Sequence, residues 1–255
     1  MAKKIAIVTG ASSGIGKKLA LGVAERYEID ELWAVARSRE RLEALQADTE
    51  VTVRAIPVDL TTPEAISTLN AMLEEEQPHV SVLINASGYG MFERFENISA
   101  EDNLGMIDLN CRALTAVTQT ALPYLGEGGI IVNIASMAAF QPVPYINVYA
   151  ATKAYVLSFS RALNRELKSR KIKVLAVCPF WTKTAFFDRS NKNSVIQHFE
   201  VMYDPAFIAE KTLKAMKKKK DYVVPGAYAK FTHALTKILP HSFVMKEFLR
   251  RQRLK

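Results

Sequence analysis

The 255-residue sequence has few cysteines, no grouped metal ligands and no long apolar run, and each absence excludes a class of protein. Its two cysteines, Cys111 and Cys178, stand far apart in apolar segments, which favours buried thiols in a reducing compartment over a disulfide framework. The four histidines are scattered, and no Cys/His cluster has the spacing of a zinc site. No apolar run approaches the roughly 20 residues that span a bilayer. We therefore expect neither a metal centre nor a transmembrane helix.

Acidic residues are scarce in the last part of the chain, where the basic charge gathers. The formal net charge of the chain is +8. Residues 211–255 hold thirteen lysines and arginines against two acids, a net charge of +11, so residues 1–210 have a net charge of −3. The basic character therefore belongs to the C-terminal region. No recognised nucleic-acid-binding motif accompanies it, so we expect no nucleic-acid partner.

The composition is that of an ordinary globular protein, with 49% hydrophobic and 24% charged residues. No repeat, low-complexity segment or second domain is visible, and the length suits one α/β domain over residues 1–255. The first apolar stretch, residues 5–8, is too short for the hydrophobic region of a secretory signal and favours a first strand. We therefore expect a single-domain cytoplasmic protein.

Apolar segments alternate with amphipathic ones along the first 180 residues. The expected strands are residues 4–9, 31–36, 51–58, 80–84, 129–135 and 173–178. This alternation predicts an α/β fold with a doubly wound parallel sheet that helices cover on both faces. Ligands bind at the carboxyl ends of the strands in such sheets. The motifs described next follow strand ends, so we expect them to line one crevice.

A glycine-rich segment, residues 10–16 (GASSGIG), lies between the first strand and an amphipathic helix that carries Leu19, Ala20, Val23 and Ala24. Glycines allow a tight turn and a close approach to a ligand. The exposed N–H groups at a helix start attract phosphate. The spacing is Thr-Gly-x-x-x-Gly-x-Gly. A simple tight turn is the alternative, and the flanking strand and helix favour a phosphate-binding loop.

Arg37 follows the second strand, with Ser38 beside it and no acidic residue before Glu40. In dinucleotide-binding folds an acid at this place binds the ribose 2′-hydroxyl, whereas an arginine accommodates a 2′-phosphate. A guanidinium suits phosphate because it donates two parallel hydrogen bonds. The position predicts NADP(H) in preference to NAD(H), with a solvated surface arginine as the alternative.

Ser136, Tyr149 and Lys153 form a candidate site for carbonyl chemistry. Ser136 ends the fifth expected strand, and Tyr149 and Lys153 share one face of the following helix at i,i+4. A phenol has an ordinary pKa of about 10, and a nearby ammonium group lowers that pKa toward the range in which proton transfer is efficient at neutral pH. We expect the lysine to act on the tyrosine in this way. An exposed tyrosine beside a surface lysine is the alternative.

Together these elements resemble the short-chain dehydrogenase/reductase family, in order and spacing, over residues 5 to about 184. The matching pieces are Thr9-Gly10-Ala-Ser-Ser-Gly14-Ile-Gly16, Asp59, Asn85-Ala-Ser-Gly88, Asn110, Ser136, Tyr149-x-x-x-Lys153 and Pro179…Thr184. The resemblance implies a Rossmann-type fold, hydride transfer between a nicotinamide cofactor and a carbonyl or alcohol, and a homodimer or homotetramer. We expect its subunit contacts in the helices around Asn110 and Tyr149.

The resemblance also implies a role for each matching residue. The pyrophosphate and adenosine ribose would contact Gly10, Ser12, Ser13, Gly14, Ile15 and Gly16. The rest of the cofactor would meet Arg37 and Ser38 (2′-phosphate), Asp59 and Leu60 (adenine), Asn85 and Ser87 (ribose), and Thr182 and Thr184 (carboxamide). Tyr149 would be the acid/base, Ser136 would orient the carbonyl, Lys153 would bind the nicotinamide ribose, and Asn110 would hold a water that links Lys153 to solvent.

Two positions depart from the family pattern. The usual Asn-Asn-Ala-Gly is Asn85-Ala-Ser-Gly88 here, and the retained first asparagine leads us to expect a normal strand end. The usual Pro-Gly after the sixth strand is Pro179-Phe180. Phenylalanine does not adopt a left-handed conformation cheaply, so we expect a changed backbone path near Thr182 and Thr184.

Residues 181–205 stand where the family keeps its substrate lid, and they are apolar and aromatic beneath their polar residues. An apolar lid predicts a hydrophobic substrate such as a 3-oxoacyl, lipid-like or steroid-like ketone, whereas the alternative is that these aromatics only pack the lid onto the body. A catalytically silent sensor or scaffold on the same fold is the competing function class. The presence of Ser136, Tyr149 and Lys153 favours an enzyme.

The C-terminal region predicts further helices. Asp204-Pro205 caps one helix, and Lys217–Lys220 would end it. In the tail, residues 227–255, Phe231, Leu235, Ile238 and Leu239 have helical spacing before Pro240, and a basic segment follows Ser242. Such a tail can lie on an anionic membrane surface, pack across a subunit interface, or pack on its own domain.

Overall fold

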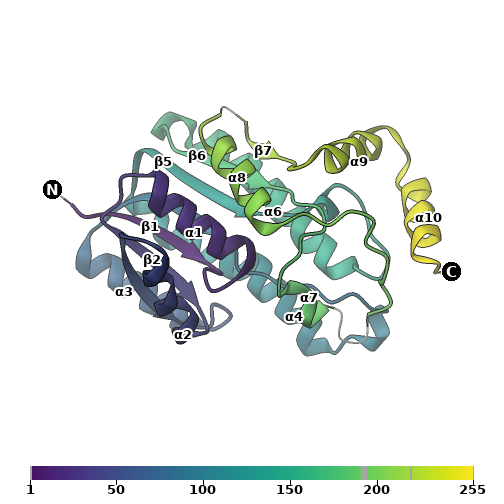
Figure 1. The fold of residues 1–255 in the computed structure, drawn as a ribbon, viewed down its shortest axis with the longest axis horizontal. Coiled ribbons are helices and arrows are strands. Elements are labelled where there is room, and N and C mark those ends of the chain that lie inside the picture. Colours follow the sequence, from purple (N-terminus) through teal and green to yellow (C-terminus); the bar gives the residue numbers. More distant parts are fainter. Residues whose placement is uncertain (1, 191–193, 219, 255) are drawn as a thin grey trace.

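A computed structural model describes residues 2–190, 194–218 and 220–254 and contains one seven-stranded, wholly parallel sheet (Figure 1). The strand order is β3-β2-β1-β4-β5-β6-β7. The strands are β1 Lys4–Thr9, β2 Glu31–Ala36, β3 Thr52–Pro57, β4 His79–Asn85, β5 Leu125–Ile134, β6 Lys173–Val177 and β7 Tyr222–Val223. The predicted doubly wound parallel α/β sheet is therefore confirmed.

The helices follow the strands along the chain, and two of them form the C-terminal tail. They are α1 Gly14–Arg26, α2 Arg39–Glu43, α3 Pro63–Glu76, α4 Ala100–Ile107, α5 Leu114–Ala121, α6 Asn147–Glu166, α7 Phe186–Ser190, α8 Pro205–Met216, α9 Ala227–Ile238 and α10 His241–Gln252. A π-helical segment, Asp108–Ala113, joins α4 to α5. None of the described helices is long and apolar enough to cross a bilayer.

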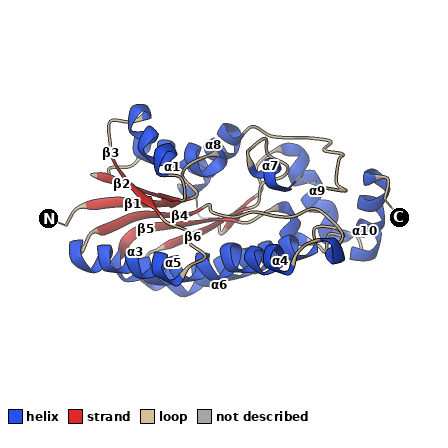
Figure 2. Cartoon of the chain, turned by 90° about the horizontal axis from the view of Figure 1, so that it is seen from below, coloured by secondary structure: helices blue, strands red, loops and turns tan. Residues whose placement is uncertain are grey.

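Side chains alternate between the two faces of each buried strand, and each face has its own core. In β1, Ala6 and Val8 pack with α1 and α8, whereas Ile5 and Ile7 pack with α3 and α5 on the other face. Figure 2 shows α1 and α8 on one side of the sheet and α3, α5 and α6 on the other. Both faces of the strand are fully buried, which is why its sequence is a continuous apolar run.

Helix starts agree with the capping residues in the sequence. The side chains of Thr62, Ser99 and Asp204 accept hydrogen bonds from backbone N–H groups in the first turns of α3, α4 and α8. Each cap satisfies a donor that the helix itself leaves without a partner. Pro63 and Pro205 begin their helices, where no N–H is needed.

Several boundaries differ from the expectation. β5 begins at Leu125, four residues before the expected start. Its N-terminal part pairs with β4 across a register shift, and the glycines in this part of the sequence gave no strand pattern. α8 ends at Met216 with Lys217 as its C-cap, so the lysine run begins at the helix end as expected. Lys219 lies outside the described residues. β7 was not expected because two residues carry no periodicity.

The sheet changes winding direction at β1, which pairs with β2 on one side and with β4 on the other. Hydrogen bonds join the end of β1 to the segment after β4. The Thr9 hydroxyl accepts from the backbone N–H of Ala86 at 3.1 Å and of Ser87 at 3.2 Å. The segments that follow β1 and β4 are thereby held side by side. In doubly wound sheets the crevice at this switch point is the ligand site.

Candidate active site

The glycine-rich segment after β1 is a compact turn that only glycine permits at two of its positions. Gly10 has φ +67°, and a Cβ there would lie 2.8 Å from the carbonyl carbon of Ala86. A Cβ on Gly16 would lie 2.1 Å from the Gly10 carbonyl oxygen. Ser13, the N-cap of α1, makes no side-chain capping bond. The N–H groups at the start of α1 are therefore available to an anion.

One cavity of about 1150 Å³ runs from this turn along the carboxyl ends of the strands to the C-terminal helices. It brings together sixteen of the predicted site residues: Gly10, Ser12, Ser13, Gly14, Ile15, Gly16, Arg37, Ser38, Asp59, Leu60, Ser87, Ser136, Tyr149, Lys153, Thr182 and Thr184. Asn85 and Asn110 do not line it. Of the strand-end motifs expected to share one crevice, Asn85 is therefore the one that does not line it. Asn110, a helical residue that the resemblance implied, lies outside the lining as well.

Asn85 lies beneath the cavity wall in a buried polar chain. Its amide donates to the Thr118 hydroxyl at 3.0 Å and to Asn133 Oδ1 at 2.9 Å, and Asn133 donates onward to the Ser160 hydroxyl. Asn85 Oδ1 is buried and has no hydrogen-bond partner among the described residues. The residue thus ties β4 to β5 and α5, below the place where it was expected to meet a ligand.

Asn110 is also buried, in the π-helical segment between α4 and α5. Its amide donates to the Tyr89 carbonyl at 2.9 Å and to the Thr152 hydroxyl at 3.0 Å, and its Oδ1 accepts from the Tyr89 N–H at 3.1 Å. These bonds fix the segment after β4 to α6. One lone pair of Oδ1 remains for the water that the resemblance implies.

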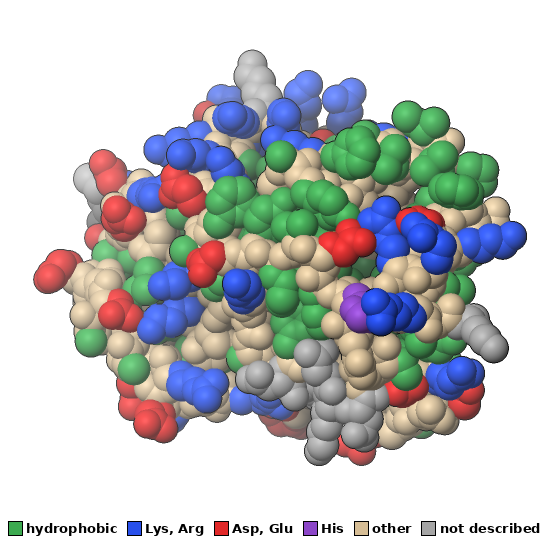
Figure 3. All heavy atoms as spheres, turned by 45° about the vertical axis from the view of Figure 1, so that its right-hand side comes forward, with side chains coloured by type: hydrophobic (Ala, Val, Ile, Leu, Met, Phe, Trp, Pro, Cys, Tyr) green, Lys and Arg blue, Asp and Glu red, His purple; other side chains and the backbone are tan. Residues whose placement is uncertain are grey.

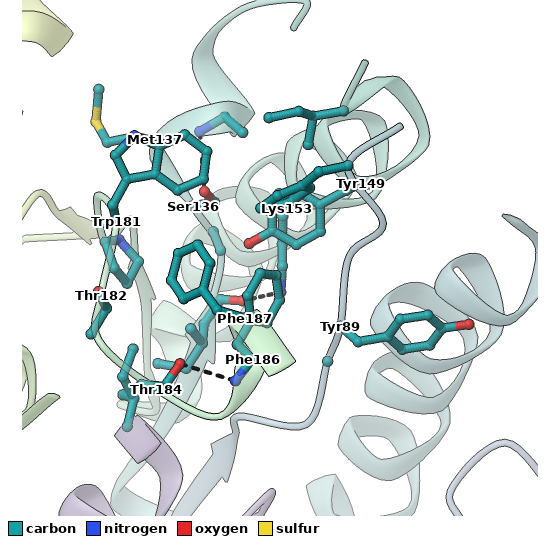
Figure 4. A pocket seen from close by; sticks show the side chains of 18 of the residues that line it. Tyr89, Ser136, Met137, Tyr149, Lys153, Trp181, Thr182, Thr184, Phe186 and Phe187 are labelled. Carbon is teal, nitrogen blue, oxygen red and sulfur yellow. Dashed lines mark hydrogen bonds between the residues drawn. The ribbon is translucent and has the colours of Figure 1, made fainter. Parts of the chain in front are cut away.

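Ser136, Tyr149 and Lys153 lie together in the middle of the cavity (Figure 4). The Ser136 hydroxyl accepts from the Ala138 N–H at 3.1 Å, and it points into the same space as the Tyr149 hydroxyl. The Lys153 ammonium donates to the Ile134 carbonyl at 2.8 Å and lies 5.6 Å from the Tyr149 ring centroid. β5 and α6 therefore deliver all three groups to one point.

Burial dominates the electrostatics of this group. Burial raises the pKa of Tyr149 to about 12, and a hydrogen bond with Ser136 only partly opposes this. Burial lowers the pKa of Lys153 to about 8. The expectation that Lys153 holds the Tyr149 pKa below its ordinary value is wrong for this structure. The physical reason is that the ammonium is bound to Ile134, while the low-polarity surroundings disfavour both charged forms.

Phe180, at the position where the family pattern has glycine, keeps an ordinary backbone conformation. It is not among the described residues with positive φ, so no left-handed conformation is required there. Its ring packs at 6.0 Å from the Trp181 ring and 5.5 Å from the Tyr228 ring of α9. Thr182 and Thr184 still reach the cavity, and the Thr184 methyl group lies 3.0 Å from where a Cβ on Gly14 would be.

The lid is an aromatic cluster built around Phe92, a fully buried residue that the sequence analysis did not identify. Its ring lies 5.6 Å from Trp181, 5.8 Å from Phe186, 6.3 Å from Phe187 and 6.1 Å from Tyr149. The lid aromatics therefore pack on the body as the alternative held. All five rings line the cavity, which makes the part of the site around Tyr149 apolar.

The C-terminal helix α10 holds the lid through contacts that the sequence analysis also missed. The Gln252 side-chain oxygen accepts from the N–H groups of Gln197 at 3.2 Å and His198 at 3.1 Å, and its amide donates to the His198 carbonyl at 2.7 Å. Arg251 pairs with Glu200 at 2.8 Å. The described tail therefore packs on its own lid. No local pattern predicts such contacts, because they join residues more than fifty positions apart.

Arg41 is another cavity residue that the sequence analysis did not name. It lies in α2, whose N-cap Ser38 accepts from the Arg41 N–H. Arg37 and Arg41 thus give two guanidinium groups at the end of the cavity beyond β2. The signal was present in the sequence as a further arginine four positions after Arg37.

Comparisons with known proteins agree with this geometry. A sequence model described as "short chain dehydrogenase" matches residues 4–195. An uncharacterized oxidoreductase of Staphylococcus aureus strain MW2 is 29% identical over 216 residues, which cover 84% of this chain and 90% of that protein.

Two solved structures share the fold and 29% sequence identity. One is a short-chain dehydrogenase from Sphingobium yanoikuyae in complex with NADPH, with a TM-score of 0.79 over 94% of this chain and 97% of that one. The other is the bulky-bulky ketone specific alcohol dehydrogenase from Comamonas testosteroni, with a TM-score of 0.75 over 95% and 94% of the two chains. The similarity therefore includes the C-terminal part of the chain.

The buried lysine predicts a pH-dependent stability that a neutral side chain would lack. The Lys153 pKa is about 8 when folded and has an ordinary value of 10.5, so the unfolded state binds more protons between these values. Relative to Lys153→Met, the free energy of unfolding of the wild type should therefore rise, by the order of 2–3 kcal/mol, between pH 8 and pH 10.5. Urea unfolding across this range measures the difference. Lys168→Met, at an exposed position, is the control. Parallel profiles for wild type and Lys153→Met would contradict the burial of a titrating lysine.

Proposed function

The chain belongs to the short-chain dehydrogenase family, and we propose that it is an NADP(H)-dependent oxidoreductase that interconverts an apolar ketone or aldehyde and its alcohol. The observation that carries the proposal is the placement of Ser136, Tyr149 and Lys153 in the cavity that also holds the glycine-rich turn. One end of that cavity has the chemistry of a phosphate site and the middle has proton donors. We further propose that residues 1–255 act as a single domain.

The residues at the cavity end suit a dinucleotide. The glycine turn and the start of α1 would hold its pyrophosphate, because a Cβ at Gly10 or Gly16 would fill the cradle and the helix N–H groups are open. Arg37 and Arg41 would hold a 2′-phosphate, with Asp59 and Leu60 beside the adenine and Ser87 near the ribose. Thr182 and Thr184 would contact the carboxamide. The bound cofactor would supply or accept the hydride.

The protein groups would position the carbonyl and manage its proton. Ser136 and Tyr149 would donate hydrogen bonds to the carbonyl oxygen, where negative charge develops as the hydride arrives. The raised pKa of Tyr149 keeps its proton in place at neutral pH until it is needed. Lys153, beside the ring, would stabilise the phenolate that proton transfer leaves, and it would hold the nicotinamide ribose.

The apolar wall supports a hydrophobic substrate. Phe92, Trp181, Phe186 and Phe187 surround the space next to Tyr149, and they leave few polar groups there to bind a small hydrophilic carbonyl. A lid of this kind excludes water from the reacting atoms. Cys111 and Cys178 are free thiols, which agrees with a reducing compartment such as the cytoplasm.

A dinucleotide sensor without turnover is the second candidate, since the same fold carries both functions. The intact trio of Ser136, Tyr149 and Lys153 favours the enzyme. Buried polar side chains are costly to retain without a use. Turnover separates the two candidates directly.

The acid/base role predicts a specific effect of Tyr149→Phe. The variant keeps the ring that packs against Phe92 and Phe186, so NADPH binding should stay within about twofold of the wild type. The rate of carbonyl reduction should fall by roughly 10²–10⁴-fold because the proton donor is lost. Tyr155→Phe, on an exposed side of α6, is the matched control. NADPH oxidation with medium-chain ketones measures both, and wild-type rates in Tyr149→Phe would contradict the proposed role.

The cofactor preference predicts a change in Arg37→Asp. Loss of a charged hydrogen bond to the 2′-phosphate should raise the dissociation constant for NADPH by roughly 10–100-fold, with little change for NADH. Arg39→Asp, two residues on and outside the cavity, is the control. Fluorescence titration with both nucleotides gives the constants. An unchanged NADPH constant in Arg37→Asp would remove the basis for NADP(H) preference.

We also propose a homodimer, or a tetramer built from it, through the face of α4, α5 and α6. Ile107 and Tyr155 are exposed there, and Tyr155 stacks on Phe159 while its hydroxyl lies 2.8 Å from that of Thr115. Exposed apolar side chains grouped on neighbouring helices are typical of subunit contacts.

This interface predicts a change of mass on substitution. Ile107→Glu should convert the oligomer to a monomer, because a carboxylate buried in an apolar contact has no partner. Phe95→Glu, an exposed aromatic outside these helices, should leave the mass unchanged. Light scattering reports the mass of each. A wild-type mass for Ile107→Glu would place the interface elsewhere.

A further inference from the structure

The two C-terminal helices expose an unusual amount of apolar surface. Half of the large hydrophobic residues that the described chain exposes lie here: Phe231, Leu235, Ile238 and Phe243. Ile238 is 79% exposed and Phe231 is 63% exposed. Figure 3 shows hydrophobic side chains gathered toward the upper right of this view, over the C-terminal helices, with lysines and arginines beside them.

Helical spacing organises these residues into stripes. On α9, Phe231, Leu235 and Ile238 stand at i, i+4 and i+7 and share one side. On α10, Phe243, Lys246 and Arg250 share one side in the same way. We call this surface the outer face of the tail. It comprises Phe231, Leu235, Ile238 and Phe243 with the exposed cations Lys230, Lys237, Lys246, Arg250 and Arg253.

The same two helices also form a wall of the active-site cavity. Thr232 of α9, Leu239 just after α9, and Val244 and Phe248 of α10 line it. Phe231, Leu235 and Phe243 both line the cavity and are exposed, so they stand at its mouth. An apolar path therefore leads from the outer face of the tail to Tyr149.

The charge of the tail decides what fits this surface. Residues 227–255 hold seven lysines and arginines against one acid, Glu247, a net +6. A second copy of the same face would bring like charges together, which disfavours a symmetric contact. An anionic lipid surface instead attracts clustered cations while its interior accepts the aromatic and aliphatic side chains.

We propose that the outer face of the tail docks on an anionic membrane surface, where the mouth of the cavity receives an apolar carbonyl substrate from the lipid. The docking stands on the exposed residues alone, whereas the delivery of substrate rests on the function proposed above. Because α10 is bonded to the lid through Gln252 and Arg251, the docked helix and the lid keep a fixed relation.

Co-sedimentation of the full chain with lipid vesicles tests the docking. The wild type should pellet with vesicles of phosphatidylcholine and phosphatidylglycerol, and much less with phosphatidylcholine alone or at high salt. The combined variant Lys230→Glu/Lys246→Glu/Arg253→Glu should lose at least roughly tenfold in affinity for the anionic vesicles. Ile238→Ser, which lies outside the cavity lining, should weaken binding further when added to it.

Two matched controls separate the face from general charge and hydrophobicity. Lys18→Glu/Arg165→Glu/Lys168→Glu reverses three exposed cations on α1, on α6 and just after it, and Phe95→Ser removes an exposed aromatic elsewhere. Both should bind as the wild type does. Three results would each overturn the proposal. The controls could lose as much vesicle affinity as the tail variant, the tail variant could bind vesicles as the wild type does, or the wild type could fail to bind vesicles. A tail-dependent increase in mass without vesicles would also overturn the proposal, and it would assign the face to a second copy.

Activity distinguishes this proposal from the proposed function. With a short water-soluble ketone, the tail variant should turn over at the wild-type rate. With a long-chain ketone carried in anionic vesicles, its rate should fall with its vesicle affinity. An unchanged rate there would overturn the delivery of substrate from lipid. Absence of turnover in every form, with docking intact, would count against the proposed function and leave the docking supported.

Discussion

The structure depends on the position of β1, which pairs in parallel with β2 and β4 at the same time. Because the chain winds away from β1 in both directions, the segments that follow β1 and β4 cannot be covered by one crossover helix and leave a crevice. The Thr9 hydroxyl holds the two sides of that crevice together through Ala86 and Ser87. The close approach of Gly10 to Ala86 depends on the same contact. The glycine turn, the arginines after β2 and the group of Ser136, Tyr149 and Lys153 all line this crevice.

Burial is the second constraint, and it sets the chemistry. α6 places Lys153 in the interior, where its ammonium donates a hydrogen bond to the Ile134 carbonyl. Burial of the charge is unfavourable, and it lowers the pKa of Lys153. The aromatic lid around Phe92 packs on one side of Tyr149, and burial raises the pKa of this tyrosine. The C-terminal helices complete this enclosure because Gln252 bonds the lid backbone. The fold and the burial of Tyr149 and Lys153 are thus connected through packing.

Local patterns in the sequence predict the parts of the structure that depend on neighbours along the chain. β1 and β2 have the expected bounds because continuous apolar runs end at Gly10 and Arg37. The placement of Ser136, Tyr149 and Lys153 in one cavity follows from strand ends that must meet at one edge of the sheet. The contacts of Phe92 and Gln252 join segments far apart in sequence, and no periodicity encodes them. The direction of the Tyr149 pKa was also mispredicted, because burial raises it and no local pattern encodes burial in the folded chain.

The most direct test of the account follows the hydride itself. The protein would be incubated with NADPH carrying deuterium at C4 of the nicotinamide and with a series of apolar ketones, and the alcohol would be analysed by mass spectrometry. If the protein reduces ketones as proposed, one deuterium appears on the carbinol carbon, and it comes from one face of the nicotinamide only. Tight NADPH binding without transfer of label to any ketone or aldehyde would contradict this account, and would identify the crevice as a binding site without this chemistry.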